Sequence, residues 1–160
     1  MKEAHDFFAA SVGAAAAFIG LLFVAVTLAP ERIFGPEAHP KRRADAIGAF
    51  AALGNVFFVS LVGLMPTENY DVMLGVAVLS IFRLVREAYR ASKRISLLRV
   101  LQTFGIVPLI VYVAEFVVVL LLRAGLTSIG GLLGIILGLY AYALATSWGL
   151  LGAREFSETS

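Results

Sequence analysis

The sequence predicts an all-α integral membrane protein, a bundle of five transmembrane helices with the N-terminus outside and the C-terminus in the cytoplasm. Two features of the composition predict the membrane: 60% of the residues are hydrophobic and only 15% are charged. Soluble proteins carry roughly a quarter charged residues. A third observation, the placement of the basic residues, predicts the orientation. Apolar segments fill most of the chain, so we expect residues 1–160 to form a single transmembrane domain.

Each expected span is an apolar run close to the roughly 20 residues that cross a bilayer as a helix. Helix-breaking residues separate the runs: Pro30, Pro36 and Pro40 follow the first, and Pro66 with Asn69 forms a tight turn after the second. We expect the spans at roughly Phe7–Ala29, Asp45–Met65, Tyr70–Tyr89, Val100–Leu122 and Ser128–Leu151.

The lysines and arginines lie almost wholly in alternate joints between these runs. In a five-span arrangement, all but Lys2 and Arg123 of the 13 basic residues fall on one side of the membrane. Cytoplasmic loops carry the excess of basic residues, so that side is the cytoplasm. The third span is short, because the apolar run Val72–Phe82 covers only about 16 Å as a helix. It must therefore include Arg83, with the charged head reaching the cytoplasmic headgroups.

Glu115 is the candidate functional residue that stands out most, because it lies about 10 Å below the outer end of the fourth span. An acid in hydrocarbon costs several kcal/mol unless it finds a proton, a partner or water. Glu115 is therefore a candidate for a proton or cation site, or for an acid that lines a pore. The alternative is a structural role as partner of a buried donor, with Arg83, Asn55 and Tyr112 as the candidates.

Two more polar residues in the spans are candidates for an ion pathway. Arg83 and Glu115 differ in depth by about 7–8 Å, which allows an ion pair between helices. The simpler interpretation is that Arg83 snorkels and pairs with Glu87 four residues on. Asn55 lies on a helix face with Gly48 and Ala52, a pattern that favours a hydrogen bond between closely packed helices over ligand recognition.

Small residues repeat at four-residue spacing in the first and fifth spans. Gly13 and Ala17 belong to the first repeat, and Gly130, Gly134 and Gly138 to the second. Such repeats let two helix backbones approach closely. They predict either contacts within one protomer or an interface between copies, and we expect a homo-oligomer.

Basic clusters on the cytoplasmic side are candidates for contact with anionic lipid, although they also serve orientation alone. Their members are Lys41, Arg42, Arg43, Arg90, Lys93 and Arg94. The same topology explains the net positive charge without nucleic acid. The two histidines lie outside the spans and there are no cysteines. No catalytic or nucleotide-binding motif is recognisable, so we expect no enzyme, no metal and no cofactor.

One stretch of sequence supports a resemblance. The run FFAASVGAAAAFIGLLFVAVTLAPERI, followed by GNVFFVSLVGLMP, resembles small multi-pass proteins of the bacterial inner membrane, a largely uncharacterised group. The resemblance covers mainly residues 7–66. It implies a bacterial inner (plasma) membrane and adds no site residues.

Two functions remain open from the sequence. The first is an oligomeric ion channel or small transporter, with Glu115, Asn55 and Arg83 along a polar path. The second is an accessory protein without catalytic activity that binds another membrane protein through a glycine-rich helix face. The acid within a membrane span favours the first.

Overall fold

The computed structural model describes residues 2–28, 30–36, 38, 40–66, 69–92 and 106–152, and their regular structure is helical. Within these ranges lie five long helices and one short helix: α1 (Lys2–Leu28), α2 (Pro30–Phe34), α3 (Pro40–Gly63), α4 (Tyr70–Ser92), α6 (Val107–Arg123) and α7 (Gly130–Gly152). The all-helical class predicted from the sequence is confirmed. Each long helix overlaps one expected span, and residues 100–105 of the fourth expected span lie outside the described residues.

Three of the described helices are long and apolar enough to cross a membrane. They are α1, the Lys41–Gly63 part of α3 and the Gly130–Trp148 part of α7. The other two long helices do not meet these requirements of length and low charge. Helix α4 carries four charged residues from Asp71 to Glu87, and the described part of α6 is only 17 residues long. The structure therefore describes a helical protein with three candidate membrane spans.

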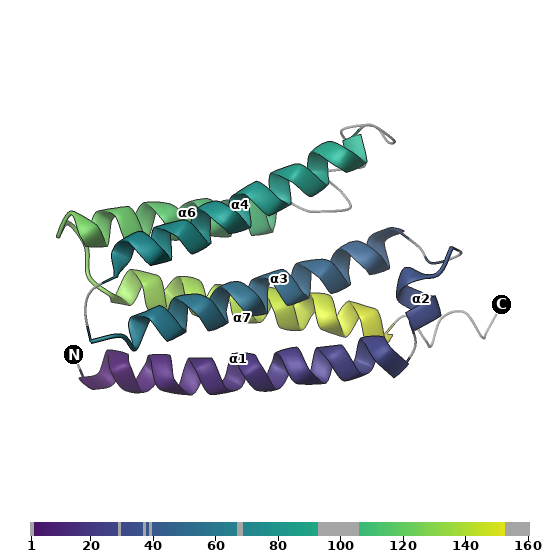
Figure 1. Ribbon diagram of the computed structural model, residues 1–160, viewed down its shortest axis with the longest axis horizontal. Coiled ribbons are helices and arrows are strands. Elements are labelled where there is room, and N and C mark those ends of the chain that lie inside the picture. Colours follow the sequence, from purple (N-terminus) through teal and green to yellow (C-terminus); the bar gives the residue numbers. More distant parts are fainter. Residues whose placement is uncertain are drawn as a thin grey trace.

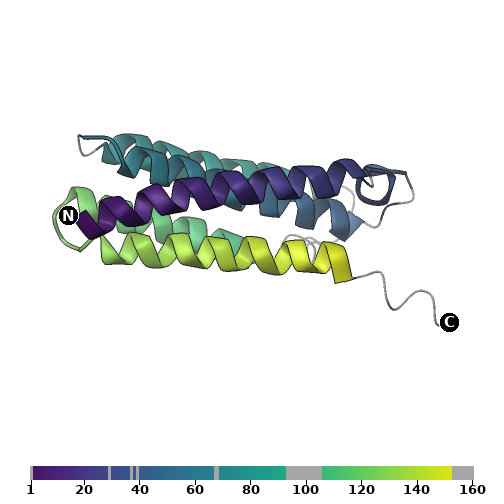
Figure 2. The same cartoon turned by 90° about the horizontal axis from the view of Figure 1, so that it is seen from below.

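Helix α3 occupies the centre of the bundle. It packs against α1, α4 and α7, while α6 packs against α4 and α7. In Figure 1, α4 and α6 form one layer, α3 and α7 lie next to it, and α1 lies on the opposite side from α4 and α6. Seen from below in Figure 2, α1 and α7 run side by side along the length of the molecule.

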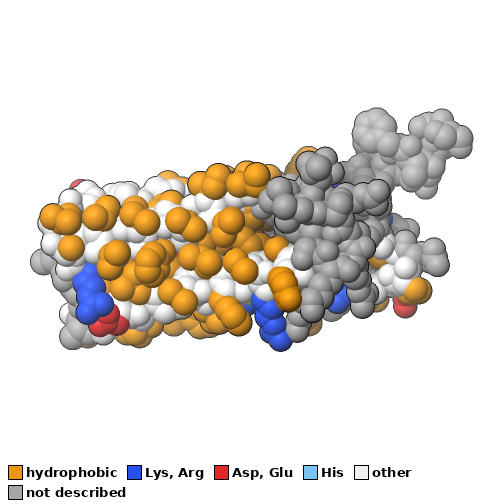
Figure 3. All heavy atoms as spheres, turned by 90° about the horizontal axis from the view of Figure 1, so that it is seen from above, with side chains coloured by type: hydrophobic (Ala, Val, Ile, Leu, Met, Phe, Trp, Pro, Cys, Tyr) orange, Lys and Arg blue, Asp and Glu red, His pale blue; other side chains and the backbone are white. Residues whose placement is uncertain are grey.

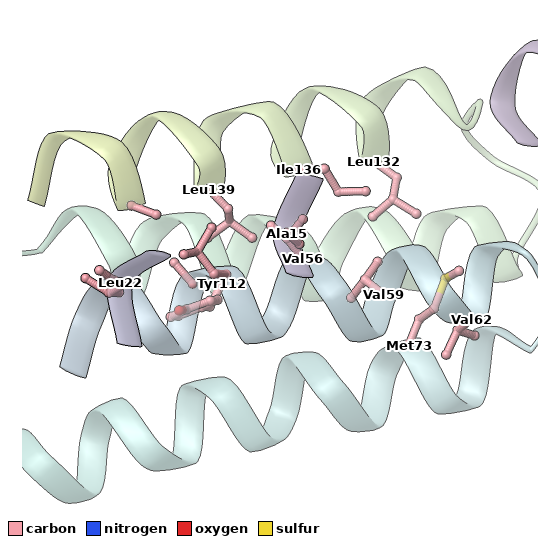
Figure 4. Packing of buried hydrophobic residues seen from close by; sticks show 14 of the residues in the cluster. Ala15, Leu22, Val56, Val59, Val62, Met73, Tyr112, Leu132, Ile136 and Leu139 are labelled. Atoms are coloured by element: carbon pink, nitrogen blue, oxygen red, sulfur yellow. The ribbon is translucent and has the colours of Figure 1, made fainter. Parts of the chain in front are cut away.

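A seam of small side chains lets α3 hold this central position. Ala46, Ala49 and Ala52 are each 0% exposed. Gly63 continues the seam, because a Cβ there would lie 2.7 Å from the ring of Phe8 on α1. Larger apolar side chains fill the rest of the core, among them Val56 and Val59 of α3 and Leu132, Ile136 and Leu139 of α7 (Figure 4).

The end of α6 is fixed by a glycine in the left-handed conformation. Gly125 has a φ of +69°, and the following Leu126 N–H donates to the Leu121 carbonyl at 2.9 Å. A glycine adopts this conformation without a steric penalty and so satisfies the last carbonyls of a helix. The chain then turns back within a few residues, and α7 lies antiparallel to α6.

The surface over α4 and α6 is covered by hydrophobic side chains, with charged side chains at the left end and Lys or Arg towards the right (Figure 3). The exposed apolar residues include Val78, Leu79 and Phe82 of α4 and Ile110 and Val117 of α6. At the end where α4 begins and α6 ends, Arg123 pairs with Asp71. An apolar surface band of this kind is typical of a face covered by lipid or protein.

Candidate functional site

Glu115 lies at the junction of three helices. Its side chain projects from α6 and is only 1% exposed. The amide nitrogen of Asn55 on α3 donates to both carboxyl oxygens, at 2.9 Å to Oε2 and 3.2 Å to Oε1. The same nitrogen donates to Ser80 Oγ on α4 at 3.0 Å. An amide group has two hydrogens, so one serves Ser80 and the other is shared by the two carboxyl oxygens.

The hydrogen bonds of this cluster leave one buried acceptor unused. Ser80 Oγ donates in turn to the Val76 carbonyl of its own helix at 3.0 Å. Asn55 is only 4% exposed, and its Oδ1 has no hydrogen-bond partner in the described structure. Buried polar atoms without partners are rare in folded proteins and call for an explanation. This acceptor lies on the side chain that holds Glu115.

A mainly apolar cavity lies beside this cluster, with a volume of about 540 Å³ that includes open solvent at its mouth. It is formed between the first half of α3, the second half of α4, the start of α6 and the later part of α7. Ser80 belongs both to the cavity wall and to the hydrogen-bonded cluster. The other polar side chains of the wall are Arg83, Glu87, Tyr112 and Tyr142.

Tyr112 connects the cavity to the buried acid. It lies one turn before Glu115 on α6, is 3% exposed, and its hydroxyl is within electrostatic range of Arg83, Glu115 and Tyr142. Figure 4 shows it among the buried apolar side chains. Tyr142 reaches the cavity across α3, where Gly48 leaves room, because a Cβ at Gly48 would lie 2.8 Å from the Tyr142 hydroxyl.

The ion pair expected for Arg83 is not found. Among the described residues, the ion pairs join Arg123 to Asp71 and His5 to Asp6. Arg83 therefore pairs with neither Glu87 nor Glu115. Asn55 takes the position next to the acid. Arg83 instead lines the cavity.

A second polar cluster, not predicted from the sequence, lies between α1, α3 and α7. Ser60 Oγ donates to Ser11 Oγ at 2.9 Å, and the Tyr140 hydroxyl lies 3.2 Å from Ser11 Oγ and donates to the Ser11 carbonyl. Ser11 and Ser60 are nearly fully buried. Tyr140 thus forms its hydrogen bonds inside the bundle. Serines give a weak sequence signal, because their hydroxyls can also bond the carbonyls of their own helix.

The small-residue faces of α1 and α7 point away from the bundle. Gly13, Ala17, Gly130, Gly134 and Gly138 are all exposed. A Cβ added at Gly13, Gly134 or Gly138 would meet no atom within 4 Å. Contact within one protomer, one of the two interpretations of these repeats, is therefore not what the structure describes. The close packing inside the bundle uses the alanines of α3 instead.

Three of the basic residues considered for lipid contact, Lys41, Arg42 and Arg43, lie in the first turn of α3. Lys41 and Arg43 are exposed and Arg42 is half-buried. The Arg43 guanidinium lies 6.0 Å from the centre of the Phe34 ring. Arg90 belongs to the last turn of α4, while Lys93 and Arg94 lie outside the described residues.

No group of three or more His, Asp or Glu side chains that could hold a metal ion exists in the part of the chain that the structure describes. The oxygen-rich cluster of Glu115, Asn55 and Ser80 contains a single carboxylate. Such a set suits a proton or a monovalent cation better than a divalent metal, which needs more charge from its ligands.

Comparison with known proteins returned no match: no family model fits the chain, and no curated protein or solved structure is significantly similar to it.

Proposed function

We propose that this protein is a small multi-pass membrane transporter in which Glu115 binds and releases a proton or a monovalent cation. The observation that carries the proposal is the pairing of a fully buried carboxyl group with an amide instead of a basic residue. A carboxylate in a low-dielectric interior is costly without a cation. Glu115 therefore gains from taking up a proton or cation and can release it to a hydrated path.

The cavity supplies such a path. Ser80 joins the Glu115–Asn55 pair to the cavity wall through one hydrogen bond. Because the cavity wall includes Ala44 of α3, next to Lys41, Arg42 and Arg43, we propose that the cavity lies on the cytoplasmic side. The amide of Asn55 lies between the acid and Ser80 of the cavity wall, so exchange of the proton requires water that enters from the cavity.

The transporter is proposed to cross the membrane five times, with the N-terminus outside and the C-terminus in the cytoplasm. Exposed apolar residues along α4 and α6, such as Phe82 and Ile110, support lipid contact for these two helices. The basic residues of the joints that we propose to be cytoplasmic fit a membrane with anionic lipids, such as a bacterial inner membrane.

Flux in reconstituted vesicles tests the role of Glu115. We expect the wild type to dissipate an imposed gradient of protons, Na⁺ or K⁺. Glu115→Gln should lower that flux to the level of protein-free vesicles, because the amide keeps hydrogen-bonding capacity but cannot ionise. Exchange of the exposed Glu3 for Gln is the control and should leave the flux unchanged. Full flux of every tested ion in Glu115→Gln vesicles would remove the acid from the mechanism.

A second candidate function is an accessory protein that binds another membrane protein. The outward-facing glycines of α7 favour it, because they leave an unpartnered surface on which a helix can pack closely. The same surface also suits a homo-oligomer, which is the form expected for the transporter.

Leucine substitutions on α7 separate self-association from partner binding. We expect the double variant Gly134→Leu/Gly138→Leu to reduce the mass of the purified complex in nanodiscs to that of one copy, because leucines hold the helix backbones apart. Gly75→Leu on α4, also exposed and without neighbours within 4 Å, is the matched control. A wild type that is already a single copy would argue against a homo-oligomer and favour the accessory role.

A further inference from the structure

The cavity beside Ser80 contains a positive charge that the proposed role of Glu115 does not use. Arg83 lines this cavity, and neither ion pair among the described residues includes it. A guanidinium presents a planar set of N–H donors that matches the oxygens of a carboxylate or a phosphate. Arg83 is an exposed side chain of the cavity wall, so an anion can reach its guanidinium.

The rest of the cavity wall suits a small molecule with a polar and an apolar end. The hydroxyls of Tyr112 and Tyr142 in the wall can donate to anionic oxygens, whereas Ser80 already donates to the Val76 carbonyl. Apolar side chains line the remainder and include Ile47, Leu84 and Pro108.

We propose that this cavity binds a small organic anion, a carboxylate or a phosphate ester, with Arg83 as its counter-ion. Glu87 also lines the cavity, but it takes part in an interaction of its own. The anion lies with its charged end towards Arg83 and the hydroxyls, and its apolar part lies against Ile47 and Leu84. The site deepens the proposed function by naming the substrate class, while the binding step itself does not depend on transport.

The anion site and Glu115 influence each other through charge. Asn55 and Ser80 face Glu115 from α3 and α4, and Tyr112 lies between Glu115 and Arg83. Tyr142 contributes a hydroxyl from α7, with Asp45 of α3 in electrostatic range of it. A second negative charge in this low-dielectric region disfavours ionised Glu115. Binding of the anion is therefore accompanied by uptake of a proton on Glu115. A monovalent anion and this proton together carry no net charge, so their joint transport moves no charge across the membrane.

Calorimetric titration of the full-length protein in phosphatidylcholine nanodiscs tests the site. The soluble probes are benzoate and phenyl phosphate. In a separate arm, the nanodiscs contain phosphatidylglycerol as the source of an anionic headgroup. We expect the wild type to bind a soluble probe with a Kd in the millimolar range or tighter. Arg83→Gln should weaken binding by about tenfold or more, as loss of a charge-assisted hydrogen-bonded pair does. Arg86→Gln is the matched control, because Arg86 is exposed on the same helix and is not part of the cavity wall.

The lipid arm distinguishes the two sources of the anion. Binding of phosphatidylglycerol alone, again weakened in Arg83→Gln, supports the site and identifies its occupant as a lipid headgroup. If Arg83→Gln does not fold, Arg83→Lys serves instead: it keeps the charge without the planar fork, and binding should still weaken. Absence of binding in the wild type, or equal affinity of wild type and Arg83 variants for every probe, overturns the proposal.

Proton uptake during the titration separates this inference from the proposed function. In weak buffer we expect net uptake of protons, at most one per bound anion, in the wild type, and none in Glu115→Gln, which still binds the anion. Anion binding without any ion flux would leave the site standing and refute the transporter. Ion flux that persists without anion binding would refute the site and leave the transporter standing.

Discussion

Replacement of Asn55 by leucine is expected to destabilise the protein by about 2–3 kcal/mol, because it removes the amide that donates to both carboxyl oxygens of Glu115. The carboxyl group is 1% exposed, so water cannot replace the lost donor without entering the bundle. The leucine fits the space of the amide approximately, so the cost comes mainly from the unsatisfied acid. Unfolding in mixed micelles, followed by the fluorescence of the single Trp148, measures the difference.

A double-mutant cycle isolates the contact from general effects of each substitution. Glu115→Leu removes the acid as well, and the double variant should be more stable than the sum of the single effects predicts. An interaction energy of about 1–2 kcal/mol is expected, at the upper end of values for hydrogen bonds inside membrane proteins. Thr27→Val, at an exposed hydroxyl that bonds its own helix, is the control and should cost less than about 0.5 kcal/mol. Additive effects in the cycle would contradict the paired arrangement.

The sequence predicted the positions of the helices well, because the length of an apolar run and the residues that break it depend on local chemistry. Pro66 follows the end of α3, and Gly125 stands at the end of α6. What the sequence lacked was the rotation of each helix about its axis. Depth along the helix axes brought Arg83 near Glu115, but only the orientation of α3 and α6 in the bundle decides that Asn55 is the partner.

The glycine repeats illustrate the same limit. A small-residue stripe indicates a face on which close packing is possible, and it does not say whether that face meets the same chain, a second chain or lipid. The structure turns Gly13 and Gly134 outward and packs the bundle on Ala46, Ala49 and Ala52 of α3. These alanines belong to a region rich in small residues in which several faces looked equivalent from the sequence.

The cavity could not be predicted from the sequence, because its wall comes from four helices that are far apart along the chain. Arg83 and Ser80 are within one turn of each other on α4, which is a local pattern. Tyr112 and Tyr142 join them only through the packing of α6 and α7. The sequence did identify Asn55 and Glu115 as unusual, since polar groups in apolar runs require partners.

Labelling of single cysteines is expected to give an all-or-none pattern that decides between three and five membrane crossings. The chain has no native cysteine, so each introduced thiol reports one position. An impermeant maleimide applied to right-side-out membrane vesicles should label Thr127→Cys, between α6 and α7, without lysis. Pro36→Cys, between α2 and α3, should react only after lysis.

The decisive position is Tyr89 near the end of α4, where the side chain is 61% exposed. In the five-span arrangement, Tyr89→Cys is cytoplasmic and behaves like Pro36→Cys. In a three-span arrangement, α4 and α6 would remain outside, and Tyr89→Cys would react without lysis.

The three-span arrangement would leave the basic residues that follow Phe82 outside, against the usual distribution of positive charge. It would also expose to water the apolar surface over α4 and α6 that Figure 3 displays, with Phe82 and Ile110 both about 60% exposed. Both costs are avoided if α4 and α6 cross, so we expect Tyr89→Cys to be protected until the vesicles are opened.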